Sequence, residues 1–199
     1  GQTFFPWRRV GELALPVAPL HALPSALGQD VSVRRYPGYP ALLDYCRRSA
    51  NPVGRLLLAL YRIDEPQAAD WSDRICTGLQ LANFWQDVAV DWGKGRIYLP
   101  QDELARFDLD ESALADGGRS GNWAALMRAQ TDRARRMLES GAPLTHRLPG
   151  RIGWELRLVV QGGLRILERI DRVDGDVFRR RPRLRAGDWL LMATRSLAM

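Results

Sequence analysis

The stretch LQLANFWQDVAVDWGKGRIYLP, Leu79 to Pro100, combines an otherwise apolar helix with four polar side chains. At 100° per residue, Gln80, Asn83, Asp87 and Asp91 share an arc of roughly 80°. The rest of the circumference is mostly apolar, which is typical of a helix buried in a core. Two carboxylates one turn apart in such a helix repel each other and are costly to desolvate, so the pattern predicts a positive group opposite them.

The positive group can be an arginine or a divalent cation, and the DxxxD spacing alone leaves both open. Oxygen donors without His or Cys suit Mg²⁺, which keeps several waters and binds through one or two carboxylates together with substrate phosphates. Lys94 and Arg96 follow the carboxylates directly. Their side chains can bind a diphosphate whose charge the metal also neutralises. The whole stretch therefore favours Mg²⁺ over an arginine as the positive group.

The rest of the chain also has helical periodicity, without alternating strand patterns, and predicts one all-α domain over residues 1–199. Glycine-rich turns such as DWGKG and GGRSGN separate the helices, and Gly187-Asp188 is a candidate N-cap for the last one. The expected helices are Ala18–Gly28, Tyr39–Asn51, Val53–Tyr61, Ala69–Trp92, Gln101–Phe107, Trp123–Ser140, Ile152–Val173 and Asp188–Ala198.

The segment YCRRSANPVGRLLLALY, Tyr45 to Tyr61, contains a proline inside a helical pattern. Pro52 cannot donate its amide to the carbonyl of Arg48, so the helix must kink near Asn51. The kink either serves packing alone, with Gly54 as a helix contact, or turns backbone polarity toward a binding cavity.

The amino-acid composition limits the classes of function that the protein can have. The net charge is +6, and Lys94 is the single lysine among 29 basic residues. The planar guanidinium of arginine suits phosphate oxygens. The excess of arginine over lysine is, however, also explained by the nucleotide composition of the gene. No nucleic-acid recognition motif is present. No apolar run approaches the ~18 residues of a membrane span. Cys46 and Cys76 are expected to be buried free thiols in a reducing cytoplasm.

These motifs resemble the squalene/phytoene synthase family. NFWQDVAVDWGKGRIYLP is similar to its second aspartate-rich motif, NxxxDxxxD followed by a basic residue and R-x-Y, and the Tyr45 segment is similar to its Y-C-x-x-x-A-x-x-V-G helix. The resemblance implies an isoprenoid synthase fold in which Tyr45 faces the cavity with Asp87 and Asp91. It implies that Asn83, Asp87 and Asp91 hold Mg²⁺, that Gln80 is a polar neighbour, and that Arg96 and Tyr98 lie on the diphosphate side.

The segments SANPVGRL, LANFWQDV and DGDVFRRRPRL narrow the resemblance to hydroxysqualene synthases of the HpnC type, from about Gln29 onward. This implies that presqualene diphosphate loses diphosphate and that water captures the rearranged cation. The cavity is expected to be lined by Leu57, Leu58, Phe84 and Val88, with Asn51 and Ser49 near the capturing water. Presqualene diphosphate or phytoene synthesis, and a non-catalytic assembly role on this scaffold, stay open.

The family's first aspartate-rich helix has no counterpart between Gly1 and Met199, since DEPQAAD (64–70) and DRVDGD (171–176) are wrongly placed. We therefore expect the chain to be the C-terminal two-thirds of the enzyme, inactive by itself, with some core faces open to water. The basic segment RRRPRLR, Arg179 to Arg185, is expected to be a solvated loop rather than a contact to diphosphate or to anionic lipid at a membrane periphery.

Overall fold

A computed structural model of the chain describes residues 24–26, 28–29, 32–119 and 121–199. Within these ranges the protein is all-α, as predicted, and the only pairing of extended backbone is one isolated parallel bridge between Arg35 and Ile97. None of the described helices is both long enough and apolar enough to cross a lipid bilayer.

The helices follow one another mostly through short connections, apart from the longer segment 172–185 before the last helix. They are α3 (Tyr39–Ser49), α4 (Asn51–Leu60), α5 (Pro66–Gln86), α6 (Val88–Gly93), α7 (Gln101–Arg106), α8 (Glu111–Ala115), α9 (Trp123–Gly141), the 3-10 helix η1 (Ala142–His146), α10 (Gly150–Asp171) and α11 (Ala186–Leu197).

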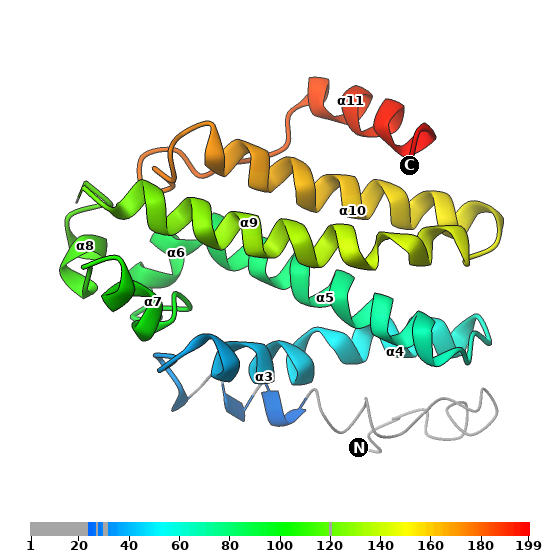
Figure 1. The fold of residues 1–199 in the computed structure, drawn as a ribbon, viewed down its shortest axis with the longest axis horizontal. Helices are drawn as coiled ribbons and strands as arrows, with labels where there is room; N and C mark the ends of the chain where they lie inside the picture. The colour runs from blue at the N-terminus through cyan, green and yellow to red at the C-terminus, as the bar shows by residue number, and fades with distance from the viewer. Residues whose placement is uncertain (1–23, 27, 30–31, 120) are drawn as a thin grey trace, which may run out of the picture.

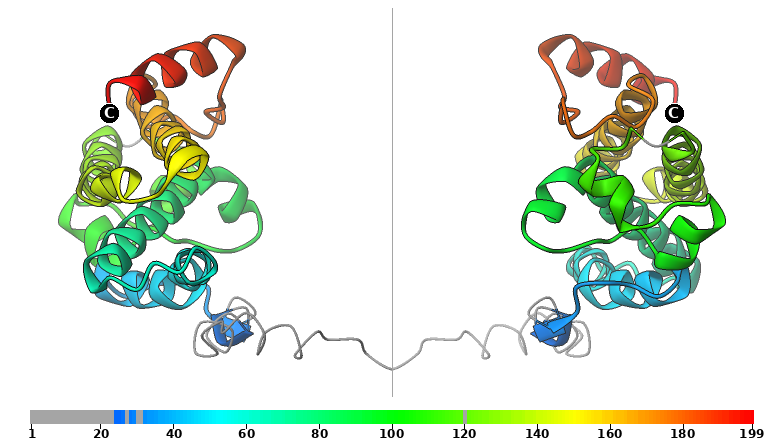
Figure 2. Two further views of the ribbon diagram at one scale, coloured as in Figure 1. Left: turned by 90° about the vertical axis from the view of Figure 1, so that its right-hand side faces the viewer. Right: turned by 90° about the vertical axis from the view of Figure 1, so that its left-hand side faces the viewer.

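Helix α5 is the centre of the bundle. It packs against α4, α9 and α10, while α11 packs on α10 at the opposite side of the bundle from α3 (Figures 1 and 2). Bulky side chains from several helices fill the space around α5 and exclude solvent, among them Trp85, Leu81, Trp123, Leu126 and Leu138. Because α5 is covered on several sides, groups at its C-terminal end are held on a rigid support.

The structure tests the predicted helix boundaries near Pro52 and near Asp87. The expected kink is confirmed, because α3 ends at Ser49 and α4 restarts at Asn51 with Pro52 in its first turn. The expected continuous helix Ala69–Trp92 is wrong, because Asp87 lies between α5 and α6 with φ −105° and ψ 12°. The predicted helix Ala18–Gly28 falls mostly outside the described residues, although residues 24–26 and 28 are helical.

The C-terminal helix begins earlier than expected. Its N-cap is Arg185, and Asp188 is the third helical residue, whose carboxylate accepts a hydrogen bond from the Arg185 amide. The predicted N-cap at Gly187-Asp188 is therefore wrong by two residues. A carboxylate at this position completes a capping box and complements the positive end of the helix.

The close approach of α9 to α5 depends on Gly141. A Cβ added there would lie 2.6 Å from the backbone oxygen of Trp71 and 3.0 Å from the amide nitrogen of Ile75. Because backbone atoms cannot move aside, we expect Gly141→Val to lower the free energy of unfolding by about 3 kcal/mol or more. Urea unfolding measures the change.

Gly187→Ala is the matched control for this substitution. No atom lies within 4 Å of a Cβ at Gly187, which is in the first turn of α11. We expect this variant to be as stable as wild type or slightly more stable, because alanine restricts the unfolded chain more than glycine does. Equal stability of the two variants would contradict the close-packing argument.

Candidate active site

The oxygen-bearing residues of the opening stretch remain one turn apart despite the break at Asp87. The Asp87 amide donates to the Asn83 carbonyl at 2.9 Å, and the Asp91 amide donates to the Asp87 carbonyl at 2.8 Å. The local distortion therefore leaves the stack intact. Asn83 is exposed, and Gln80, Asp87 and Asp91 are half-buried, so this polar end of α5 is reached by solvent.

The positive group opposite Asp87 is an arginine in this structure. Arg181 Nη2 donates to Asp87 Oδ2 at 2.9 Å, and Arg181 Nε donates to the other oxygen, Oδ1. The hydrogen bond to Asp87 raises the pKa of Arg181, and the nearby charge of Asp91 adds to the effect. The expectation that Arg179–Arg185 is only a solvated loop is therefore wrong at Arg181.

A glycine turn returns the chain to the carboxylates. Gly95 has φ +74°, a left-handed conformation that glycine adopts without strain, and the Arg96 amide donates to the Asp91 carbonyl at 2.8 Å. Ile97 then hydrogen-bonds to the carbonyl of Arg34 at 3.0 Å. This fixes Arg96 beside Asp91, where both residues line one small cavity.

The Nε of Arg96 is buried and has no hydrogen-bond partner within the described ranges. A buried donor that makes no hydrogen bond is energetically costly. At substrate-binding sites a ligand supplies the missing acceptor. Lys94 is exposed at the same turn. The two cationic residues that were predicted to grip a diphosphate thus lie next to the carboxylates, as their spacing suggested.

Tyr45 and Tyr98 belong to an aromatic cluster under this polar end. Tyr98 stacks on Phe84 with ring centroids 3.9 Å apart, and Tyr45 lies 6.0 Å from Tyr98 and 6.1 Å from Phe84. Tyr45 is 3% exposed. The cluster therefore joins α3, α5 and the segment after Gly95, and it sets the position of Arg96 relative to α5.

Asn51 lies elsewhere. It is buried, accepts a hydrogen bond from Thr77 Oγ1 at 3.0 Å, and lines a surface depression with Arg47, Asp73 and other residues that are not part of the Asp87 stack. The structure does not bring Asn51 together with the other predicted site residues. Its polarity near the kink is explained by the bond to Thr77 across α4 and α5.

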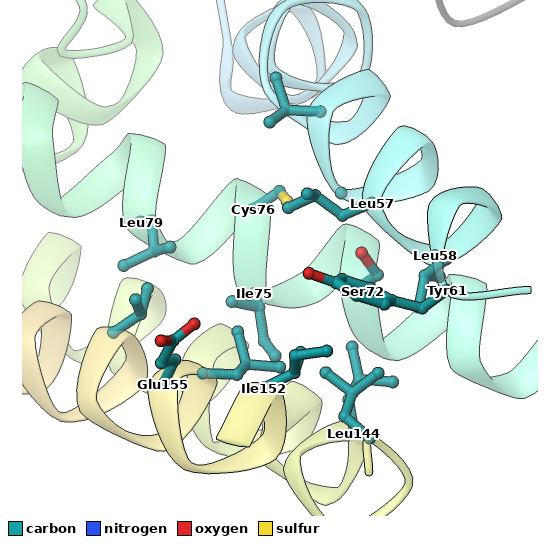
Figure 3. A pocket seen from close by; sticks show the side chains of 15 residues that line it. Leu57, Leu58, Tyr61, Ser72, Ile75, Cys76, Leu79, Leu144, Ile152 and Glu155 are labelled. Atoms are coloured by element: carbon teal, nitrogen blue, oxygen red, sulfur yellow. The ribbon is translucent and has the colours of Figure 1, made fainter. Parts of the chain in front are cut away.

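An apolar groove of about 330 Å³ runs along α5 between α4 and α10 (Figure 3). From α5, the side chains of Ser72, Ile75, Cys76 and Leu79 point into it. The other walls come mainly from α4, η1 and α10, including Leu57, Leu58, Tyr61, Leu144, Ile152, Leu156 and Val159. Two of these residues, Leu57 and Val159, are 50% and 47% exposed, so the groove is open to solvent.

The structure separates the four residues that were expected to line one apolar cavity. Leu57 and Leu58 line the groove, whereas Phe84 and Val88 do not and instead bound the small cavity next to Asp91. The sequence alone missed Ser72, Cys76 and the wall from α10. The spacing of Ser72, Cys76 and Leu79 on the same helical face as Asn83 was the signal that would have found them.

Both cysteines are free, as predicted, but only Cys46 is fully buried, whereas Cys76 is half-buried. Burial raises the pKa of the Cys46 thiol to about 12, and burial also raises the pKa of Cys76. A thiol with a raised pKa is a weak nucleophile at neutral pH. Cys76 therefore contributes to the groove as a small apolar side chain.

The donor set at Asp87 fits half of a divalent-cation site. Two carboxylates and an amide oxygen are hard ligands of the kind Mg²⁺ uses together with waters and phosphates. Within the described ranges, no group of three or more His, Cys, Asp or Glu side chains forms a complete metal site. The residues present therefore suit a cation that also takes ligands from a bound anion or from other residues.

Comparison with known proteins decides the family. The squalene/phytoene synthase family matches residues 8–188, earlier than the start near Gln29 that the motifs suggested. The chain belongs to this family. The solved structure of squalene synthase HpnC from Alicyclobacillus acidocaldarius superimposes with a TM-score of 0.80 at 33% identity, over 83% of this chain and 63% of that one, which confirms the isoprenoid synthase fold.

Curated relatives within the squalene/phytoene synthase family divide between two products. Phytoene synthase of Arthrospira platensis is 33% identical over 188 residues, which are 86% of this chain and 60% of that protein. Hydroxysqualene synthase of Sinorhizobium fredii is 32% identical over 148 residues, 71% of this chain and 50% of that protein. The chain thus spans about half to three-fifths of the length of these relatives.

Proposed function

We propose that this chain forms part of a Mg²⁺-dependent prenyl diphosphate enzyme that converts presqualene diphosphate to hydroxysqualene. The observation that carries the proposal is the continuity of one face of α5. Ser72, Cys76 and Leu79 line the apolar groove, and Asn83 and Asp87 follow on the same face toward the helix end. An apolar groove, followed further along the same helix face by oxygen ligands and cationic side chains, suits a molecule with a prenyl tail and a diphosphate head.

Different residues would bind the diphosphate head and the prenyl tail of the substrate. Asp87, Asp91 and Asn83 would hold Mg²⁺, which supplies neutralisation of the diphosphate charge as that group leaves. Arg96 and Lys94 would donate to the diphosphate oxygens, and the buried Arg96 Nε gains the acceptor it lacks. The groove excludes water from the isoprenoid chains and holds them in place.

In the proposed reaction the carbon–oxygen bond of presqualene diphosphate breaks and diphosphate leaves with the electron pair. The cyclopropylcarbinyl cation rearranges, water adds to it, and one proton is lost to give hydroxysqualene. Phytoene or presqualene diphosphate synthesis is the second candidate, supported by the phytoene synthases among the relatives. These candidates share the head and tail sites. Phytoene synthesis differs in how the rearranged cation is quenched, whereas presqualene diphosphate synthesis is the earlier step that joins two farnesyl diphosphates with loss of one diphosphate.

Product analysis separates these candidates. We would assay both the 199-residue chain and the longest in-frame product of its gene with presqualene, farnesyl and geranylgeranyl diphosphates. Hydroxysqualene from presqualene diphosphate supports the proposal, and phytoene or presqualene diphosphate as the product contradicts it. A protein that binds these substrates in neither form would instead point to a non-catalytic assembly role.

The substitution Leu57→Asp tests whether the apolar groove binds the prenyl tail, as proposed for this tail site. This residue is half-exposed in the groove, so a carboxylate there should leave the fold intact but oppose an apolar tail. We expect roughly tenfold weaker binding of farnesyl thiolodiphosphate by calorimetry, which corresponds to losing the burial of about one leucine side chain.

Leu60→Asp provides the comparison for Leu57→Asp. Leu60 lies on the same helix and is also 50% exposed, but it does not line the groove. We expect Leu60→Asp to bind farnesyl thiolodiphosphate with an affinity close to that of the wild type. Equal losses in both variants would mean that the groove is not the tail site.

A further inference from the structure

The ion pair between Arg181 and Asp87 occupies both oxygens of a proposed metal ligand. Its partners lie 94 residues apart in the sequence, and their side chains are 39% and 15% exposed. In a bidentate pair the guanidinium takes one lone pair on each carboxylate oxygen and holds its positive charge close to both. A metal ion that ligates Asp87 would therefore lie beside the positive charge of Arg181, which opposes its binding unless Arg181 moves away from at least one oxygen.

The backbone next to Arg181 is held against the end of α5. Gln86 Nε2 donates to the carbonyl of Pro182 at 2.5 Å, and Pro182 is buried. The guanidinium of Arg181 is partly exposed, whereas its neighbour in the chain is fixed. Release of the side chain from Asp87 would therefore leave the positive charge close to the site.

Other arginines of the segment have different partners. Arg179 pairs with Asp176 at 3.0 Å, and the Arg185 amide binds Asp188 at 2.6 Å. Arg183 is exposed. Within the described ranges, Arg181 is the member of Arg179–Arg185 that forms a salt bridge with Asp87.

We propose that Arg181 is a built-in competitor of the divalent cation at Asp87, and that a diphosphate anion relieves the competition by accepting the released guanidinium. The inference rests on the proposed metal and diphosphate site. Cation binding alone either costs the Arg181–Asp87 pair or places two positive charges side by side, whereas cation and anion together give each charged group a new partner. The two ligands should therefore bind cooperatively, with Arg181 as a positioning residue that carries the coupling.

The test is titration of the purified chain with Mn²⁺, followed by electron paramagnetic resonance of the free ion. We expect Arg181→Gln to bind Mn²⁺ about fivefold or more tightly than wild type, because the competing pair is gone. Arg181→Lys keeps the charge without the fork and should lie between the two. Arg183→Gln removes the same charge from the same segment and should remain near wild type.

Asp87→Asn distinguishes failure of the inference from failure of the proposed function. If Asp87→Asn loses Mn²⁺ binding while Arg181→Gln and Arg183→Gln change it equally, the metal site stands and the competition is overturned. If no form binds Mn²⁺, or Asp87→Asn binds it as wild type does, the proposed metal site fails and the inference fails with it.

Inorganic pyrophosphate provides the second measurement. Added pyrophosphate should tighten Mn²⁺ binding more in wild type than in Arg181→Gln, because only wild type gains an acceptor for a released Arg181. The formation of manganese pyrophosphate in solution is identical for all variants and cancels in the comparison. An equal gain in wild type and Arg181→Gln would overturn the proposed coupling.

Discussion

Replacing Asp87 with asparagine is expected to abolish turnover of presqualene diphosphate in the longest in-frame product of the gene. Asparagine keeps the size of the side chain but offers one neutral oxygen instead of two charged ones, so the proposed metal site loses an anionic ligand. We expect kcat/KM to fall at least about a thousandfold, the scale on which loss of a main electrostatic contribution is felt. Measured turnover near wild type would show that the metal assignment is wrong.

Folding of Asp87→Asn should be almost unchanged. Removal of an uncompensated buried charge would stabilise the chain, but Arg181 already neutralises this carboxylate. Loss of a partly exposed ion pair costs about 1 kcal/mol or less. Asp73→Asn is the matched control, because Asp73 lies on α5, the helix that ends next to Asp87, and forms a similar bidentate pair with Arg55. It should keep activity.

The sequence specified those parts of the fold that depend on local chemistry. Pro52 in a helical pattern gave the break between α3 and α4, and the glycines of DWGKG gave the turn at Gly95. Apolar periodicity around Leu81 and Trp85 correctly placed the opening helix in the core. In each case the signal is the geometry of a few neighbouring residues.

Features that join distant segments were not accessible in the same way. The partner of Asp87 lies in a basic run that has the composition of a solvated loop, and only tertiary packing selects Arg181 from it. Asn51 looked like a cavity residue because of its neighbours in the sequence, but its side chain bonds to Thr77 on another helix. The interruption of the helix at Asp87 also has no local breaker such as glycine or proline.

Asp188→Asn is expected to cause a large loss of stability. The carboxylate is 2% exposed and accepts from Arg165 Nε at 2.7 Å, from Arg169 Nη2 at 2.5 Å and from the Arg185 amide at 2.6 Å. Asparagine would remove the counter-charge that Arg169 and the buried Arg165 share, leaving Arg165 with its pair to Glu168, and breaking a buried pair from one side is strongly destabilising. We expect the Tm to fall by several degrees and α11 to detach from α10.

This loss should depend on pH. Burial alone would raise the pKa of Asp188, but hydrogen bonds from the Arg185 amide and from the Arg165 and Arg169 guanidinium groups outweigh it and hold the pKa well below its usual range. A carboxylate with a depressed pKa stabilises the fold above its unfolded value of about 3.9 and loses that contribution as the pH falls toward the folded value.

Urea unfolding of wild type and Asp188→Asn at pH 7 and at pH 3 measures this dependence. The stability difference between them should be largest at pH 7 and smaller at pH 3. Asp70→Asn, which removes an exposed pair with Arg74, should cost only about 0.5 kcal/mol at pH 7. Because Asp188 fixes the Arg185 amide at the end of the segment that carries Arg181, Asp188→Asn should also loosen the pair with Asp87. A difference that is unchanged between pH 7 and pH 3 would show that the carboxylate charge does not hold α11 in place.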